Sequence, residues 1–149
     1  MTPRQQLDSF LQKYTPEIQK LTKGVLRKLR AIAPGATELV YDNYNALVIG
    51  FGPTERASDA AFSIAIYPRW IQLFFLEGKT LDDPHGLLEG SGKQVRRIIL
   101  RDSEALDDKG IHDLLRQAME QAKMTVGGRS RLVIKSISKK QRPRTPSHL

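Results

Sequence analysis

The glycine- and lysine-containing segment 85–97, HGLLEGSGKQVRR, is the first stretch of the sequence whose residue types suggest phosphate chemistry. A Walker-type loop needs a glycine five positions before its Gly-Lys pair and a serine or threonine after the lysine. Leu87 occupies the first of these positions and Gln94 the second, and Val95 stands where a dinucleotide fingerprint has its third glycine. The segment leads into VRRIILR, which has the pattern of a strand, so no helix N-terminus would direct amide groups at a phosphate. We therefore expect a surface loop with glycine turns and no saturable binding of ATP or GTP.

Two sets of carboxylate and imidazole side chains lie close together in the sequence and are candidate metal ligands. They are Asp82, Asp83 and His85, and then Asp108, His112 and Asp113. Positions 108 and 112 are four apart and would share a helical face, a spacing that metal sites use. A simpler explanation is that acidic residues at a helix start complement the helix dipole and that aspartates in loops form turns. We therefore expect no metal site and no cofactor.

Covalent and hydrolytic chemistry has little support in this sequence. The chain contains no cysteine, which excludes thiolate nucleophiles, thiolate metal sites and disulfides. His85 and His112 are possible general bases, but no G-x-S-x-G nucleophile motif is present. We expect no catalytic residues, although a site assembled only in the folded chain stays open as an alternative.

Basic side chains form two candidate anion-binding groups. The first follows one face of a helix expected over 16–33, and the second surrounds the loop and strand after it. They are Lys20, Lys23, Arg27 and Arg30, and then Lys93, Arg96 and Arg97. A solvated helix face is the ordinary role of such residues, and a site for phosphorylated ligands or a nucleic-acid backbone is the functional alternative.

The positive charge is concentrated at the C-terminal end. The chain has 24 lysines and arginines, 16 aspartates and glutamates, and a formal net charge of +8. Residues 121–149 contain eight basic residues and no acidic one, so the rest of the chain is neutral overall. The segment 138–149 has almost no apolar side chain, and we expect it to be disordered. Its basic residues would then be free either to bind nucleic acid weakly and in a salt-dependent way or only to keep the protein soluble; they are Lys139, Lys140, Arg142 and Arg144.

The apolar pattern predicts two helices, a run of strands and a third helix. The helices are expected from Thr2-Pro3 to about residue 14, over 16–33, and from Asp107 or Asp108 to about residue 119. The strands are expected over 38–42, 45–51, 62–67, 70–76 and 95–101, and residues 131–137 could add one more. This order favours an α+β fold, with a mainly antiparallel sheet of about five strands packed by two N-terminal helices and one C-terminal helix.

Aromatic side chains lie on or beside the expected strands. They are Tyr41, Tyr44, Tyr67, Trp70, Phe74 and Phe75. Most should pack in the core, but strand alternation would allow some to face outward or to line a pocket between the sheet and the helices.

The segment LLEGSGKQVRRIILR, followed within a few residues by a helix start at Asp107-Asp108, resembles the YdhG-type family of frataxin-like domains of unknown function. The entry into the first strand is similar too, with a helix ending at APGA (33–36) before ELVYDNY (38–44). The resemblance covers about residues 14–123 and implies an α+β domain over 1–123 with a basic extension over 124–149. Some relatives are labelled iron chaperones by analogy with frataxin. Iron binding of that kind depends on clustered acidic residues, whereas the two early helices here contain only Asp8 and Glu17.

These observations favour a non-catalytic intracellular binding domain of YdhG type whose ligand is an unidentified small molecule or protein. The alternative is a nucleic-acid-associated protein that uses the basic tail and the basic helix stripe. No apolar segment approaches the length of about 20 residues that a membrane helix needs, and the N-terminus has no signal peptide, so we expect a cytoplasmic protein without a membrane partner. A tyrosine- or tryptophan-lined pocket would favour the first function and a continuous positive face the second. An exposed histidine beside a carboxylate would favour an enzyme.

Overall fold

Two helices open the chain, and their starts are set by threonine caps and prolines. The computed structural model describes residues 1–125 and 127–146 and begins with α1 (Pro3–Leu11) and α2 (Pro16–Ile32). Thr2 Oγ1 accepts a hydrogen bond from the Gln5 amide, while the Gln5 side chain accepts one from the Thr2 amide. Thr15 caps α2 in the same position, and each proline occupies a first-turn site where its missing N–H is not needed. Both predicted helix starts are confirmed.

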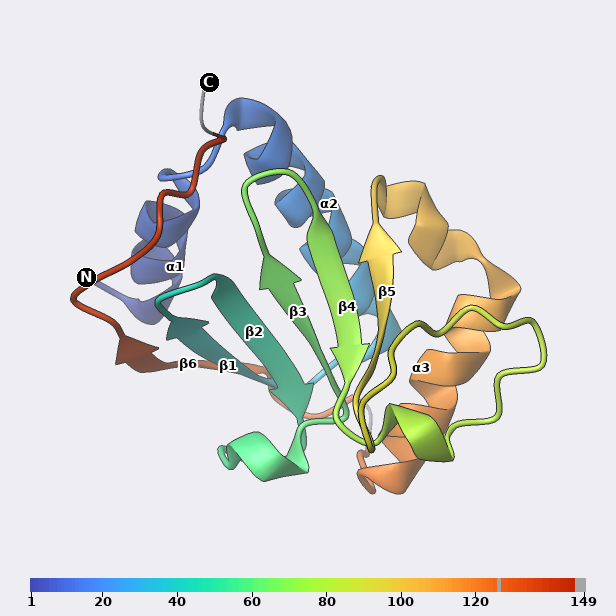
Figure 1. Cartoon of the computed structure of the whole chain (residues 1–149). Coiled ribbons are helices and arrows are strands. Elements are labelled where there is room, and N and C mark those ends of the chain that lie inside the picture. Colours follow the sequence, from blue (N-terminus) through green and yellow to red (C-terminus); the bar gives the residue numbers. More distant parts are fainter. Residues whose placement is uncertain (126, 147–149) are drawn as a thin grey trace.

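The middle of the chain forms a sheet, and its order shows how the C-terminal part joins the body (Figure 1). The strands are β1 (Thr37–Asp42), β2 (Leu47–Gly52), β3 (Phe62–Ile66), β4 (Ile71–Phe75), β5 (Arg96–Leu100) and β6 (Arg131–Ile137). Their order in the sheet is β5-β4-β3-β2-β1-β6. The first five strands pair antiparallel as expected, whereas β6 pairs parallel with β1 at the far edge. The α+β class is confirmed, and the sheet is mixed and six-stranded rather than five-stranded.

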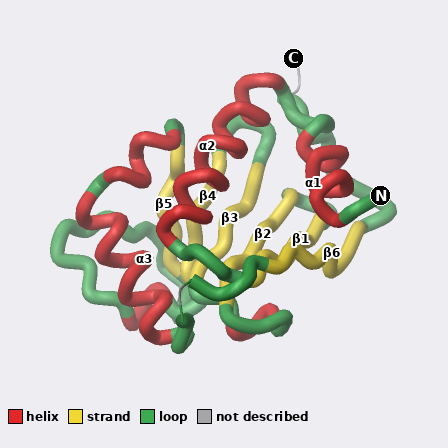
Figure 2. Tube along the Cα trace, turned by 180° about the vertical axis from the view of Figure 1, so that it is seen from behind, coloured by secondary structure: helices red, strands yellow, loops and turns green. Residues whose placement is uncertain are grey.

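All three helices lie on one face of the sheet. They stand behind it in Figure 1 and in front of it in Figure 2, with α3 (Lys109–Gln121) alongside β5. Three short 3₁₀ segments, η1 (Ala57–Asp59), η2 (Gly78–Thr80) and η3 (Ser103–Asp107), lie in the connections. The opposite face has no helix over it in either view, and we call it the open face.

Strand alternation separates the two faces. One cross-strand row consists of Val40, Ile49, Ile64, Leu73 and Ile98, and it packs against the apolar sides of the helices. From α2, the core receives Val25 and Leu29, both fully buried. The core therefore lies between the helices and one side of the sheet, and the strand residues between these positions face the other way.

The C-terminal part of the chain completes this body. Leu132 and Ile134 of β6 pack against the core. Residues 138–146, which we call the C-terminal strap, then return along the β1–β2 end of the sheet, where the Ser138 amide donates to Asp42 O and the Arg142 amide to Tyr44 O. The sequence predicts a disordered tail from residue 138, whereas residues 138–146 make backbone and side-chain contacts with the body in the structure. Residues 147–149 of that predicted tail lie outside the described part of the chain.

Within the described residues, no helix combines the length and the apolar composition that crossing a membrane requires.

Candidate functional site

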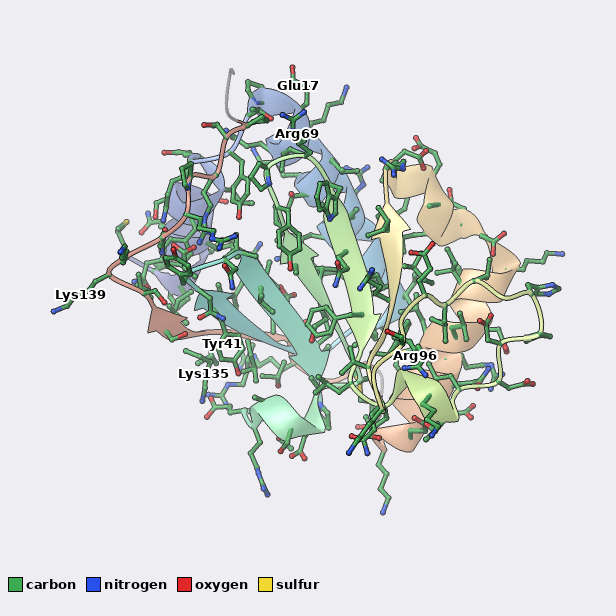
Figure 3. The ribbon with its side chains drawn as sticks, in the orientation of Figure 1. Glu17, Tyr41, Arg69, Arg96, Lys135 and Lys139 are labelled. Atoms are coloured by element: carbon green, nitrogen blue, oxygen red, sulfur yellow. The ribbon has the colours of Figure 1, made fainter. Side chains whose placement is uncertain are left out.

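Two cross-strand rows form the surface of the open face (Figure 3). The first row consists of Val133, Leu39, Gly50, Ser63, Phe74 and Arg97, in order from β6 to β5. The second row consists of Ser136, Tyr41, Val48, Ala65, Gln72 and Ile99. None of these side chains is part of the core against the helices. The open face is therefore a second, independent surface built by the same six strands.

Small residues occupy the middle of this face. Gly50, Ser63 and Ala65 lie on the two central strands and are buried, although no helix covers them. Larger side chains on the neighbouring strands, such as Tyr41 and Phe74, are only half-buried. A Cβ atom added at Gly50 would lie 3.2 Å from Ser63 Oγ, so even one methyl group would press on this floor. The arrangement is a low floor with taller side chains on both sides.

The taller side chains include four aromatic rings. Tyr67 and Trp70 flank the turn between β3 and β4, and their rings stack with centroids 5.6 Å apart at an interplanar angle of 30°. Phe74 and Tyr41 stand on β4 and β1 in the two rows. Of the six strand-associated aromatics, Phe75 is a buried core residue and Tyr44 is exposed at the β1–β2 turn. The prediction that some of these rings face outward is confirmed for the other four.

Two polar atoms on this face lack a partner. Tyr41 Oη and Trp70 Nε1 are covered by neighbouring atoms, yet neither has a hydrogen-bond partner among the described residues. Burial also raises the pKa of the Tyr41 hydroxyl above its usual value. Native structures leave few such groups unpaired, because each one costs about 1–3 kcal/mol. These two atoms therefore have hydrogen-bonding capacity that no described residue uses.

The charges of the open face are basic. Arg97 ends the first row on β5, and Lys135 lies at the bulge where β6 pairs irregularly beside Tyr41. Figure 3 shows Lys135 close below Tyr41, with Arg69 at the opposite end of the sheet. No carboxylate occurs in the two rows across the six strands, and the nearest one in register is Glu89, which pairs with Arg97 outside the edge strand.

The predicted helix stripe is divided by the structure. Lys20, Lys23 and Arg27 line a groove of about 740 Å³ between α2 and η3, together with Arg101. Arg30 does not join them, because its guanidinium binds the buried Glu38 carboxylate through two hydrogen bonds of 2.9 Å. Arg30, which the sequence groups with the candidate anion site, is thus paired with a carboxylate of the fold itself.

The second predicted basic group does not gather either. Lys93 is exposed in the loop, whereas Arg97 points to the open face. Arg96 donates hydrogen bonds to the carbonyl oxygens of Gly92 and Val95. It also packs against Gly78 of η2, and Figure 3 labels it there. Arg96 thus supports its own loop and does not contribute to a shared anion site.

The glycine- and lysine-containing loop is shaped by internal contacts. Gly86 and Gly90 have positive φ values of 63° and 137°, as expected of glycine turns. The Asp83 carboxylate accepts hydrogen bonds from the Leu87 and Leu88 amides. These amides are therefore already bound to an anionic group of the protein, which agrees with the failed match to a phosphate-binding motif.

The four basic residues of the predicted nucleic-acid tail have different roles. Lys139 and Lys140 are exposed, and the Arg142 guanidinium lies 5.5 Å from the centre of the Tyr44 ring. Arg144 is buried, and its Nη2 atom lies 2.9 Å from Asp42 Oδ1 and 2.6 Å from Asn43 O. Arg144 is therefore a structural residue and not a free nucleic-acid contact, contrary to the expectation from the sequence.

Asp42 is the centre of the polar cluster that holds the C-terminal strap. Lys13 Nζ lies 2.6 Å from its Oδ2 atom, and Arg144 binds the other oxygen. Burial alone would raise the pKa of Asp42, but hydrogen bonds from Lys13, Gln141 and Arg144 outweigh it and lower the pKa below its ordinary value. Asp42 is thus ionised and fully paired near neutral pH, which suits a structural role.

The candidate metal ligands are also engaged elsewhere. Asp108 caps α3 by accepting a hydrogen bond from the Ile111 amide. Asp113 binds Arg116 and Gln117, and the hydrogen bond from Arg116 is the main reason why the pKa of Asp113 is lowered. His85 lines a small pocket with Asp113, but that carboxylate is already paired and does not orient the imidazole. Across residues 1–125 and 127–146, no group of three His, Cys, Asp or Glu side chains comes together as a metal site would require.

Sequence reasoning did not identify the open face as a site. Alternation in FSIAI marked Ser63 and Ala65 as the less apolar side of a strand, but nothing in the sequence showed that no helix would cover that side. Comparison with known proteins adds no assignment: the chain matches no known protein family, no curated protein and no solved structure.

Proposed function

We propose that this protein is a non-catalytic binding domain, as the YdhG-type resemblance led us to expect, and that its ligand surface is the open face of the sheet. The observation that supports the proposal is the low floor of Gly50, Ser63 and Ala65 between half-buried aromatic side chains on a face without helices. Partly exposed aromatic and aliphatic side chains grouped on one sheet face without a covering helix are typical of interaction sites. On their other face, the same strands carry side chains that the helices bury almost completely. The lack of such a cover on the open face is therefore a specific feature of this fold.

The chemistry of the face favours ligands with flat, aromatic groups. The rings of Tyr41, Phe74 and the Tyr67–Trp70 pair offer flat surfaces, and stacked or edge-on aromatic contacts contribute about 0.5–1.5 kcal/mol beyond simple burial. Ser63 and Gln72 supply hydrogen-bonding groups between them. A planar ring with polar edges fits this combination better than an aliphatic molecule does.

The titratable groups with perturbed pKa values support binding rather than catalysis. Asp42 and Asp113 have lowered pKa values because they are paired, so neither is a proton donor at neutral pH. Burial raises the pKa of Tyr14 to about 12, and its hydroxyl is occupied by Ile66 O and the Leu47 amide. Each of these groups stabilises the fold and is already engaged with a partner.

A second candidate function is anion binding in the groove between α2 and η3, where Lys20, Lys23, Arg27 and Arg101 gather. It corresponds to the nucleic-acid alternative considered from the sequence. Glu17, Asp102 and Glu104 line the same groove, so its net charge is small. The open face, which has no carboxylate in its rows, is the better-supported surface.

A fragment screen observed by NMR tests the proposal even while the natural ligand is unidentified. Small aromatic fragments should shift the backbone amide signals of Ser63, Ala65 and Gln72, and matched saturated-ring fragments should shift them less. Ser63→Val would fill the floor and should abolish these shifts, whereas Ser91→Val in the exposed loop should preserve them. Clustering of the fragment-induced shifts in the α2–η3 groove, with the open face unaffected, would refute the proposal.

A further inference from the structure

We propose that the natural ligand of the open face is single-stranded nucleic acid, whose bases stack on the aromatic side chains while its phosphates contact basic residues at the two sheet edges. This inference rests on the proposed function, because it names the ligand class for the same surface. The aromatic residues of this surface were not among the nucleic-acid candidates from the sequence, which were the tail and the α2 stripe. Of the basic residues singled out there, Arg97 and Lys139 contribute to this surface.

The spacing of the rings suits separate bases. Trp70, directly before β4, and Phe74 of β4 are four residues apart along the chain, which corresponds to about 13 Å. Tyr41 and Phe74 stand on strands three positions apart, which corresponds to about 14 Å at the usual spacing between strands. These separations are several times the distance between stacked bases, so each ring would hold a different base. Sequence-tolerant recognition of single strands commonly uses such stacking positions.

The charges are arranged to complement an extended anionic chain. Arg97 on β5 and Lys135 on β6 lie at opposite edges of the six-stranded sheet, about 24 Å apart along it. The aromatic side chains stand between these edges. The two rows contain no carboxylate across the six strands, and Glu89 lies in register with Arg97 just outside β5. Lys139, exposed in the strap, adds a further positive charge beyond β6. Arg131 contributes less, because it pairs with Glu55 at 2.6 Å.

The polar groups of the face explain why a single strand is preferred over a duplex. Base faces are available for stacking on protein rings only when the strand is unpaired, and base edges are then free to form hydrogen bonds as well. Gln72 and Ser63 lie between the rings, and Tyr41 Oη and Trp70 Nε1 lack partners among the described residues. A duplex would present only its backbone to this surface and would gain none of these contacts.

The one tryptophan of the chain lies on the proposed surface and supplies the assay. Titration of the full chain with a 12-nucleotide oligo-U or oligo-dT should quench the fluorescence of Trp70 in a saturable way. If three phosphates are contacted, affinity should fall about 20-fold between 50 and 200 mM salt. A duplex of equal length and inorganic polyphosphate should bind at least ten-fold more weakly, because neither offers free base faces.

Matched variants locate the contact. Phe74→Ala should weaken oligonucleotide binding about ten-fold through lost stacking, while Tyr44→Ala, an exposed aromatic at the β1–β2 turn, should have no effect. Arg97→Gln should weaken binding and reduce the salt slope by about 0.7, whereas Arg27→Gln in the α2–η3 groove should change neither. Arg97 is exposed, so its substitution tests the surface even if Phe74→Ala lowers stability.

The possible outcomes separate this inference from the proposed function. Fragment binding at the open face without oligonucleotide binding would refute the inference and leave the proposed function standing. Oligonucleotide binding that is weakened by Arg27→Gln and unaffected by Arg97→Gln would also refute it, because the α2–η3 groove would then be the anion site. Dimerisation through the open face, detected by sedimentation and abolished by Phe74→Ala, would show that its occupant is a second copy of the chain and would likewise refute the inference.

Discussion

The two faces of the sheet are built by the same strands, yet they are suited to different tasks. On the helix side, one row consists of Val40, Ile49, Ile64 and Leu73, all fully buried aliphatic residues. One residue along each strand, the row on the open face consists of Leu39, Gly50, Ser63 and Phe74. The first row fills space uniformly, and the second has two small side chains between two large ones. The contrast indicates that stability comes mainly from one face and that the other is free to serve binding.

Polar groups on the two faces differ in the same way. Tyr14, which is buried on the helix side, donates to Ile66 O at 2.7 Å and accepts from the Leu47 amide at 3.2 Å. Tyr41, on the open face, has no partner for its hydroxyl among the described residues. The hydroxyl on the helix side is thus satisfied within the fold, whereas the hydroxyl on the open face is not.

The largest expected difference between the faces comes from two isoleucines. Ile71 is fully buried in the core, while Ile99 is half-buried on the open face. Ile71→Ala should lower the free energy of unfolding by about 4 kcal/mol, because it removes buried methyl groups and leaves a cavity. Ile99→Ala should lower it by only about 1 kcal/mol. Urea denaturation measures both, and equal losses would show that the open face is a second core covered by something other than solvent.

Substitutions in the C-terminal strap should have the next largest effect on the free energy of unfolding. Arg144→Ala removes one of the two cationic partners of the buried Asp42, leaves Lys13 as the other, and deprives Asn43 O of its donor, so it should cost about 2 kcal/mol. Arg142→Ala removes only an exposed contact with the Tyr44 ring and should cost less than about 1 kcal/mol. Thermal or urea unfolding distinguishes the two. A loss below about 1 kcal/mol for Arg144→Ala would mean that the strap is not held by its buried charge.

The contribution of Asp42 to the free energy of unfolding should depend on pH. The pKa of Asp42 in the folded protein lies below the value of about 3.9 that an aspartate has in an unfolded chain. Its stabilising effect is therefore complete above that value and is lost as the pH falls through the folded pKa. The stability advantage of the unmodified protein over Asp42→Asn should be constant from pH 5 to 8 and should shrink below about pH 4. An advantage that persists unchanged to pH 2 would contradict the ion-pair assignment.

Local signals in the sequence were sufficient for most elements but not for their arrangement. Thr2-Pro3 and Thr15-Pro16 mark helix starts through interactions within four residues, so pattern reasoning located them. The strand over 131–137 was anticipated from its apolar residues. Its parallel pairing with β1 depends on contacts about 90 residues apart, and no local pattern encodes them.

The candidate site was harder to predict because it depends on the absence of a covering helix from one face of the sheet. Composition identified Arg30 and Arg144 as free cations, but their partners Glu38 and Asp42 are distant or buried carboxylates that only the fold brings close. Charge counting treats every arginine alike, whereas burial decides which ones are neutralised. The aromatic residues were noticed from the sequence, and only the sheet register showed which of them share a face.

The smallest expected effect compares two tyrosine hydroxyls and gives the sharpest test of the contrast between the faces. Tyr14→Phe leaves Ile66 O and the Leu47 amide without their side-chain partner and should lower the free energy of unfolding by about 1–2 kcal/mol. Tyr41→Phe removes a hydroxyl that has no partner among residues 1–125 and 127–146, so it should leave stability unchanged or raise it by up to about 1 kcal/mol. Both substitutions keep the ring, so differences in packing are small and the hydrogen bonds decide the outcome. Urea denaturation of the two variants under the same conditions gives the comparison. A loss for Tyr41→Phe as large as that for Tyr14→Phe would mean that the Tyr41 hydroxyl is already satisfied, and the open face would lose one of the groups that we assign to its ligand.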